Sequence, residues 1–203
     1  MENDDFWKNY RLGDIINYWW SYRKEERPYA YSDSVCDTYP GSIGAEYLRI
    51  NKQVSGKRER NFKLFFAIIE NRLKNEKLSF IPHIHLRMGD GIKSYNDGGF
   101  QYFMKYTITL QQIQEIIKEL KSNGHTQIYA YYGIHNGKKI KESKIYLDIV
   151  RKMFKEADIN FVEKNSGNPD TDFLKMCNSK TLYTGGGRYS WFINCYRNRN
   201  ILN

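Results

Sequence analysis

The stretch HIHLRMGD, residues 83–90, alternates polar and apolar side chains before it reaches a glycine and an aspartate. Because successive side chains of a β-strand point to opposite faces, this alternation predicts a strand with two unlike faces. One face carries His83, His85 and Arg87, and the other carries Ile84, Leu86 and Met88. Three polar side chains on one face are unusual for a strand that serves only as core, so this strand is a candidate for carrying function.

Segments with strand and helix patterns alternate from about residue 79 onward. Strands are predicted at residues 79–88, 127–132, 159–162 and 181–184. Helices are predicted from Thr109, with Gln112 as capping-box partner, to Asn123, over residues 145–157, from Asp170 or Thr171 to about Cys177, and from Tyr189 to Arg197. Residues 96–99 are predicted as a loop, followed by a short aromatic stretch. The alternation predicts an α/β fold with a Rossmann-like parallel sheet and right-handed crossovers.

In a sheet of this kind, ligands bind at the carboxyl ends of the strands. The loops expected at that edge are residues 87–90, 133–136, 163–165 and 185–188. The first predicted strand would therefore deliver Arg87 and Asp90 to the ligand edge. Asp90 would either hold the geometry of Arg87 or accept hydrogen bonds from a ribose or base.

The bulk composition suits one globular domain or two small ones. The chain has 203 residues, of which 40% are hydrophobic and 27% are charged. Residues 1–78 are expected to form a short, mainly helical N-terminal region, and residues 79–203 the sheet domain. The sequence has no apolar run of about 18 residues for a membrane span and begins with acidic residues instead of a secretion signal, so we expect a cytoplasmic protein. Three cysteines without CxxC spacing, Cys36, Cys177 and Cys195, indicate reduced thiols.

The net charge of +9 indicates an attraction to polyanions. Lysines and arginines are scattered along the chain, and the densest runs, residues 57–60 and 138–141, suit solvated helix faces or loops. This distribution disfavours a nucleic-acid groove, although the charge and the 17 tyrosines keep nucleic-acid binding as an alternative. The same charge suits a small phosphorylated ligand.

A run of three glycines, Gly185, Gly186 and Gly187, joins a predicted strand to a predicted helix. Backbone without side chains lets several N–H groups point at an anion near the positive end of the helix dipole. Arg188 would add a bidentate phosphate donor. Tight packing is the alternative explanation, and the run matches neither GxxxxGK[ST] nor the placement of GxGxxG after a first strand.

The pair His83 and His85 has the spacing of two metal ligands on one strand. A zinc site needs at least a third ligand, and the neighbouring Arg87 opposes a cation. We therefore expect no metal site here, and a metal hydrolase built on these histidines is a minor alternative.

The residues His85-x-Arg87-x-Gly89-Asp90 resemble the HxRxGD motif of the fucosyltransferase superfamily. That superfamily includes the α-1,2-, α-1,6- and protein O-fucosyltransferases and the nodulation fucosyltransferase. The resemblance implies a GT-B fold in which the motif begins the nucleotide-binding half. It also implies that Arg87 contacts the β-phosphate of GDP-fucose.

A later segment is similar to a second pattern of the same superfamily, an acidic residue and a methionine before a strand, then a turn of the form NSSFSWW. The matching residues are 172–180 and 186–192, so the resemblance covers roughly residues 80–203. In the superfamily that turn contacts the nucleotide phosphates. Gly187 and Arg188 stand where the superfamily has two serines, which leaves backbone amides and a guanidinium as the phosphate donors.

The resemblance implies a metal-independent glycosyltransferase without a cofactor. It would move a fucose-like sugar from a nucleotide diphosphate sugar, with GDP preferred to UDP, to the hydroxyl of a glycan or other acceptor. The catalytic candidates are Arg87, Asp90 and Asp97. The nucleotide-binding candidates are His85, Gly89, His135, Asp172, Gly185, Gly186, Gly187, Arg188, Tyr189 and Ser190. Asp14 and Glu46 are further general-base candidates by residue type and loop placement.

The N-terminal region of residues 1–78 is short for an acceptor domain. It would be a reduced acceptor part, with an oligomer or a partner chain completing the acceptor site. For the same reason, a protein that binds a nucleotide sugar without catalysis is the main alternative to an enzyme.

Overall fold

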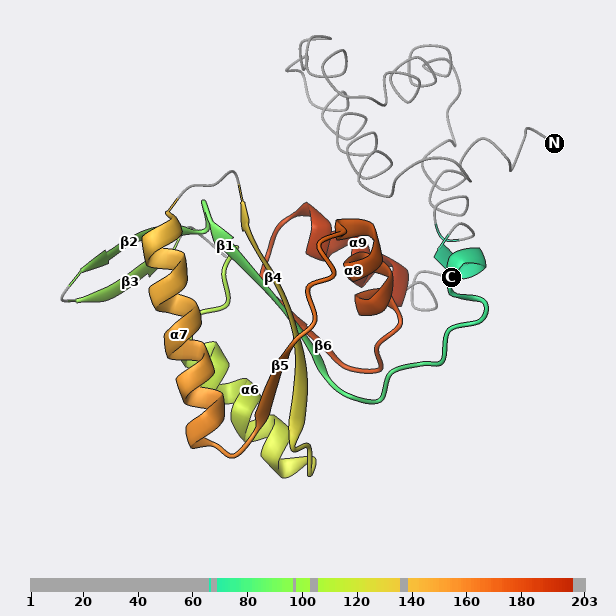
Figure 1. Cartoon of the computed structure of the whole chain (residues 1–203), viewed down its shortest axis with the longest axis horizontal. Coiled ribbons are helices and arrows are strands. Elements are labelled where there is room, and N and C mark those ends of the chain that lie inside the picture. Colours follow the sequence, from blue (N-terminus) through green and yellow to red (C-terminus); the bar gives the residue numbers. More distant parts are fainter. Residues whose placement is uncertain (1–65, 67–68, 97, 103–105, 136–138, 199–203) are drawn as a thin grey trace, which may run out of the picture. The chain divides into compact units, whose positions relative to one another are not determined.

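The computed structural model describes residue 66 and residues 69–96, 98–102, 106–135 and 139–198 (Figure 1). The described residues from Lys77 onward belong to one compact unit, the sheet domain. Most of the predicted N-terminal helical region, including Asp14 and Glu46, lies outside the described residues, and so does Asp97.

The sheet has four parallel strands in the order β5-β4-β1-β6. Their bounds are β1 (His83–Gly89), β4 (Gln127–His135), β5 (Asn160–Glu163) and β6 (Leu182–Thr184). The parallel sheet predicted from the sequence is thus confirmed, with β1 paired on both sides. β1 begins at His83 and not at Ser79, since Pro82 has no N–H to donate to a ladder. Ser79 forms only an isolated parallel bridge with Ser179.

Among the described residues, four helices cover the sheet. They are α6 (Leu110–Ser122), α7 (Ile140–Glu156), α8 (Pro169–Cys177) and α9 (Arg188–Arg197). In Figure 1, α6 and α7 lie on one side of the sheet, and α8 and α9 lie on the other. The architecture is therefore a mixed α/β fold in layers. No helix in the described part of the chain is long and apolar enough to cross a membrane.

Local capping residues determine where α6 and α8 begin. The capping box of α6 is present: Gln112 N–H donates to Thr109 Oγ1, and Thr109 N–H donates to Gln112 Oε1. The prediction for α8 was wrong by a few residues. Its cap is Asn168, whose side chain accepts from the backbone of Asp170 and Thr171, and proline occupies the first helical position.

The apolar face of β1 lies in the main hydrophobic core. Ile84, Leu86 and Met88 are almost fully buried there, together with apolar residues of α6 and α7. This confirms the prediction that β1 has two unlike faces. The buried face of α7 includes Tyr146 and Leu147, whereas Ile145 and Ile149 are only half-buried.

A β-hairpin follows β1 where the sequence predicts a loop and a short aromatic stretch. Its strands are β2 (Ile92–Asn96) and β3 (Gly99–Tyr102). Residues 97–98 between them are Asp-Gly, a dipeptide typical of two-residue hairpin turns. Phe100 of β3 contacts the ring of Tyr146, with ring centroids 5.6 Å apart, so the hairpin packs against α7.

Candidate functional site

The strand order brings the loops after β1 and β6 together. The chain passes from β1 to β4 and then to β5 on one side, and returns to place β6 on the other side of β1. In open parallel sheets, ligands bind outside the carboxyl ends of the strands at such a reversal. The residues that follow β1 and β6 therefore form the candidate site.

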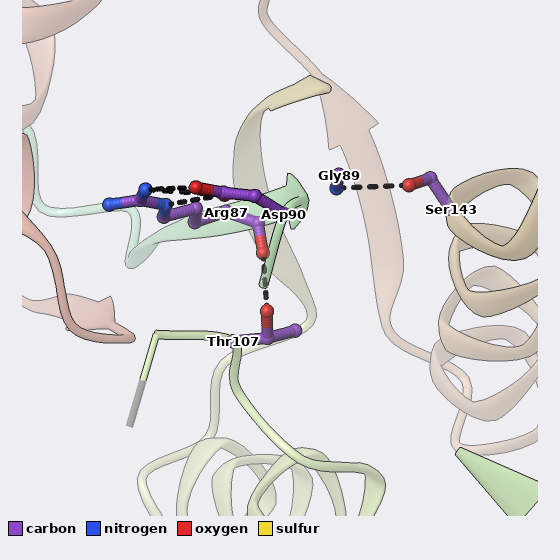
Figure 2. A network of polar contacts seen from close by, with 5 residues as sticks. All are labelled: Arg87, Gly89, Asp90, Thr107 and Ser143. Atoms are coloured by element: carbon purple, nitrogen blue, oxygen red, sulfur yellow. Dashed lines mark hydrogen bonds and ion pairs between the residues drawn. The ribbon is translucent and has the colours of Figure 1, made fainter. Parts of the chain in front are cut away.

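Arg87 and Asp90 form an ion pair at the end of β1 (Figure 2). Arg87 Nη2 lies 2.9 Å from Asp90 Oδ2, and Nε and Nη2 also donate to Oδ1. The side chains are 21% and 34% exposed, so both are accessible to a dissolved ligand. The Nε–Nη2 edge of the guanidinium is thus occupied by Asp90.

The remaining nitrogen of Arg87 lies against the turn that opens α9. A Cβ placed on Gly187 would be 2.4 Å from Arg87 Nη1, so any larger residue here would have to displace the guanidinium. Gly187 also has a φ of +108°, a conformation that L side chains rarely adopt. Among the described residues, Arg87 Nη1 makes no hydrogen bond, and no side chain caps the N-terminus of α9.

Two hydrogen bonds fix the backbone around Arg87 (Figure 2). Thr107 Oγ1 donates to the carbonyl of Arg87 at 2.8 Å, and the N–H of Gly89 donates to Ser143 Oγ of α7 at 3.0 Å. Gly89 has a φ of +78°, which favours glycine at this turn. The predicted site residue Gly89 therefore acts through its backbone.

Residues 106–108 pass between the loops after β1 and β6. A Cβ on Gly91 would lie 2.1 Å from Thr107 Oγ1, and one on Gly185 would lie 2.4 Å from the carbonyl oxygen of Tyr106. The ring of Tyr106 lies 4.8 Å from the guanidinium carbon of Arg87, within the range of a cation–π contact. Sequence reasoning missed Gly91, Tyr106 and Thr107, because no motif marks them.

His85 ties the polar face of β1 to the first turn of α9. Its Nδ1 lies 2.9 Å from Oγ of the buried Ser190, and its ring lies against that of Tyr189 with centroids 5.3 Å apart. Burial, aided by the charge of Arg87, lowers the pKa of His85 to about 4. His85 is thus neutral at pH 7, and its contacts with Ser190 and Tyr189 hold the first turn of α9 against β1.

Asp172 lies on α8, and its carboxylate is bonded to the loop that precedes this helix. Its Oδ1 accepts from the N–H of Ser166 at 2.9 Å. Burial raises the pKa of Tyr131 to about 12, and the charge of Asp172 adds to that shift. Burial also raises the pKa of Tyr189, with Asp172 again contributing, so one carboxylate lies near both tyrosines.

The structure brings together a part of the predicted site. Arg87, Asp90, Gly89, the turn of residues 185–187 and the first turn of α9 converge. Arg188 is the first residue of α9, and His135 is the last residue of β4. For both residues the structure describes the backbone and not the side chain. Asp97 falls outside the described residues.

The opposite, amino end of the same β1 face is filled by structural contacts. His83 is 2% exposed, its Nε2 lies 3.1 Å from Ser79 Oγ, and burial together with Arg197 lowers its pKa to about 4. Arg197 donates to the carbonyls of Ser179 and Lys180 and to Ser179 Oγ. In the described residues, no three His, Cys, Asp or Glu side chains gather as a metal site would require.

Comparison of the chain with protein families, with curated proteins and with solved structures found no match. The function must therefore be inferred from the residues of the site and from the two motifs.

Proposed function

We propose that this protein is a metal-independent glycosyltransferase that resembles the fucosyltransferase superfamily. Residues 79–203 would be its Rossmann-like, GT-B-type domain, which binds a nucleotide diphosphate sugar, with GDP preferred. The observation that carries this proposal is the position of Arg87 Nη1 against Gly187, beside the uncapped N-terminus of α9. A guanidinium and unpaired helix amides are the groups that bind phosphate oxygens.

The location of Arg87 and Gly187 in the sheet supports a nucleotide as the anionic ligand. Arg87 lies near the carboxyl end of β1 and Gly187 follows β6, and the strand order reverses between these two strands. Nucleotides bind at such a reversal in parallel sheets. Asp90 occupies the Nε–Nη2 edge of the guanidinium, and this limits the directions in which Nη1 can point.

The chemistry of sugar transfer suits this arrangement. The bond between the sugar C1 and the diphosphate oxygen breaks, and its electron pair leaves with the diphosphate. Positive charge and fixed dipoles placed at the leaving diphosphate lower the barrier of this step. The acceptor oxygen bonds to C1, and its proton passes to a general base. Asp97, Asp14 and Glu46 are the candidate bases from the sequence, and all three lie outside the described residues.

Calorimetric titration of the whole chain with GDP, UDP and ADP tests the donor site. We expect one diphosphate to bind selectively, and Arg87→Met to weaken that binding by about 10- to 100-fold, the value of one charged hydrogen bond. Arg151→Met is the matched control, since the ion pairs of Arg151 are with Asp148 of α7 and Glu163 of β5, and not with residues that follow β1 or β6. The Arg151→Met variant should bind the selected diphosphate with the same affinity as the unaltered chain.

Two further outcomes separate the proposal from its alternatives. Release of free sugar from the bound nucleotide sugar, undiminished by a metal chelator, would favour an enzyme over a non-catalytic binding protein. Absence of binding of all three diphosphates to the folded chain would overturn the donor site. In that case, binding to single-stranded nucleic acid at about 50 mM salt, where electrostatic binding is strong, becomes the next measurement.

A further inference from the structure

We propose that Tyr106 is a positioning residue that sets the plane of the Arg87 guanidinium. The ring centroid of Tyr106 lies 4.8 Å from Arg87 Cζ, within the range of a cation–π contact. The expected effect of Tyr106 on ligand binding rests on the proposed donor site. Its expected effect on the orientation of Arg87 rests on the geometry alone.

Asp90 by itself leaves one motion of Arg87 free. Two nitrogens of the guanidinium, Nε and Nη2, donate to the Asp90 carboxylate, and this fixes one edge of the planar group. Rotation about that edge would still swing Nη1 toward or away from Gly187. A ring against the guanidinium restricts this rotation, and so directs Nη1 at the first turn of α9.

The position of the Tyr106 ring is itself fixed by its backbone. The carbonyl oxygen of Tyr106 lies where a Cβ on Gly185 would be, at 2.4 Å. The next residue, Thr107, is 3% exposed and donates its hydroxyl to the carbonyl of Arg87 at 2.8 Å. Its Oγ1 also lies where a Cβ on Gly91 would be, at 2.1 Å. Residues 106–107 are therefore held by the strand end that carries Arg87 and by the glycine turn that faces it.

The first arm of the test measures the motion of Arg87 without any ligand. The ¹⁵N relaxation of the Arg87 Nη1–H₂ group, which Asp90 does not hold and which is assigned by its loss in Arg87→Lys, reports how restricted the rotation of the guanidinium is. We expect restricted motion in the unaltered chain and in Tyr106→Phe, which keeps the ring. In Tyr106→Leu, which removes the ring, the order parameter of Nη1–H₂ should fall toward the range of a flexible group, below about 0.6.

A matched control uses a second tyrosine in a cation–π contact. Lys164 Nζ lies 4.7 Å from the ring centroid of Tyr129. Tyr129 is paired with His83 in the sheet, four residues and about 13 Å along β1 from Arg87. Tyr129→Leu loses a comparable contact and should leave the relaxation of Arg87 unchanged.

The second arm measures binding of inorganic pyrophosphate and of the diphosphate selected by calorimetry. Tyr106→Leu should weaken both by the same factor, roughly three- to tenfold, because the ring acts on the phosphate-binding arginine. Tyr106→Phe should restore both affinities. Loss of nucleotide affinity with unchanged pyrophosphate affinity would mean that Tyr106 contacts the nucleoside, which overturns a positioning role.

The two arms distinguish the failure of this inference from the failure of the proposed function. If Arg87 becomes mobile in Tyr106→Leu but no diphosphate binds the unaltered chain, the positioning role holds and the donor site fails. If Arg87 stays equally restricted in Tyr106→Leu, the inference is overturned whatever the ligand does. Should the leucine variant not fold, Gly185→Ala displaces residue 106 and keeps the ring, and an unchanged Arg87 relaxation there also overturns the inference.

Discussion

Arg197 and Arg87 lie near opposite ends of the same face of β1, and their donors are used differently. Arg197 donates to backbone and side-chain oxygens that follow α8, from Ser179 and Lys180. Arg87 donates to one carboxylate and turns its remaining nitrogen toward Gly187. At the amino end, the donors of Arg197 are thus used within the fold, whereas at the carboxyl end Arg87 keeps a donor directed at a helix N-terminus.

On this one strand, structural residues differ from candidate site residues in what their side chains bond to. The burial of side chains alone would not distinguish structural residues from site residues, since polar side chains occur at both ends of this face. The hydrogen-bond acceptors of each arginine distinguish the two. An arginine that bonds to the carbonyls at a helix end stabilises the fold, whereas an arginine held by a single carboxylate is oriented and still has a donor for a ligand. The contrast between the two ends can be tested in three ways, of which a change of pH should have the largest effect.

Acid should destabilise the fold through the histidines at the two ends of this face. His83 and His85 both have pKa values lowered to about 4 from 6.5. Between pH 6.5 and 4 the unfolded chain binds more protons, so the stability that comes from the neutral rings is complete above pH 6.5 and lost as the pH falls toward 4. The loss is at most about 3 kcal/mol for each histidine.

Urea unfolding at pH 7.0, 5.5 and 4.5 measures this loss. His83→Gln keeps a polar group near Ser79 and removes the titration, so its free energy of unfolding should fall less steeply over this range. An equally steep fall in His83→Gln and in the unaltered chain would contradict the pKa assigned to His83.

The matched pair Arg197→Met and Arg87→Met tests the contrast between the arginines. Arg197→Met leaves partly buried carbonyls without donors, and we expect it to lower the free energy of unfolding by about 2–3 kcal/mol. Arg87→Met removes a partly exposed ion pair, worth about 0.2–1 kcal/mol. Urea unfolding at pH 7 compares the two. If Arg87→Met proved the more destabilising, the assignment of scaffold and site would be reversed.

Gly187→Ala tests the close approach at the carboxyl end. The positive φ at this position should cost about 1–2 kcal/mol of stability, and the added Cβ would push Arg87 Nη1 away from the turn. Gly133→Ala is the control, since a Cβ there meets nothing within 4 Å. Thermal unfolding of the two variants gives the measurement. Equal stability of Gly187→Ala and Gly133→Ala would mean that the turn readily accommodates a side chain.

The sequence predicted those features of the fold that depend on neighbouring residues. Alternation at residues 83–90 predicted the two faces of β1, and the pair Thr109 and Gln112 predicted the start of α6. The wrong cap for α8 arose because Asn168 and the two residues suggested in its place all have cap-forming side chains. The hairpin of β2 and β3 was missed, although its Asp-Gly dipeptide is a local signal.

The candidate site was predicted only in part, because it is assembled by contacts between distant segments. The motif predicted that Arg87 lies at a strand end, and Asp90 three residues on was within reach of it. Tyr106 and Thr107 reach Arg87 from about twenty positions away through backbone packing on two glycines. Neither shows a pattern in the sequence that distinguishes it from other tyrosines and threonines of the chain.

The bond between His85 and Ser190 joins residues 105 positions apart. A growing polypeptide emerges from its amino end, so β1 is made long before the segment that completes its polar face. Closing so long a loop also has an entropic cost, which delays such contacts in folding. A chain that ends before residue 185 has Arg87 but lacks the turn that faces it. The contact between Arg87 and Gly187 can therefore form only after residue 187 has been synthesised, and shorter chains lack it.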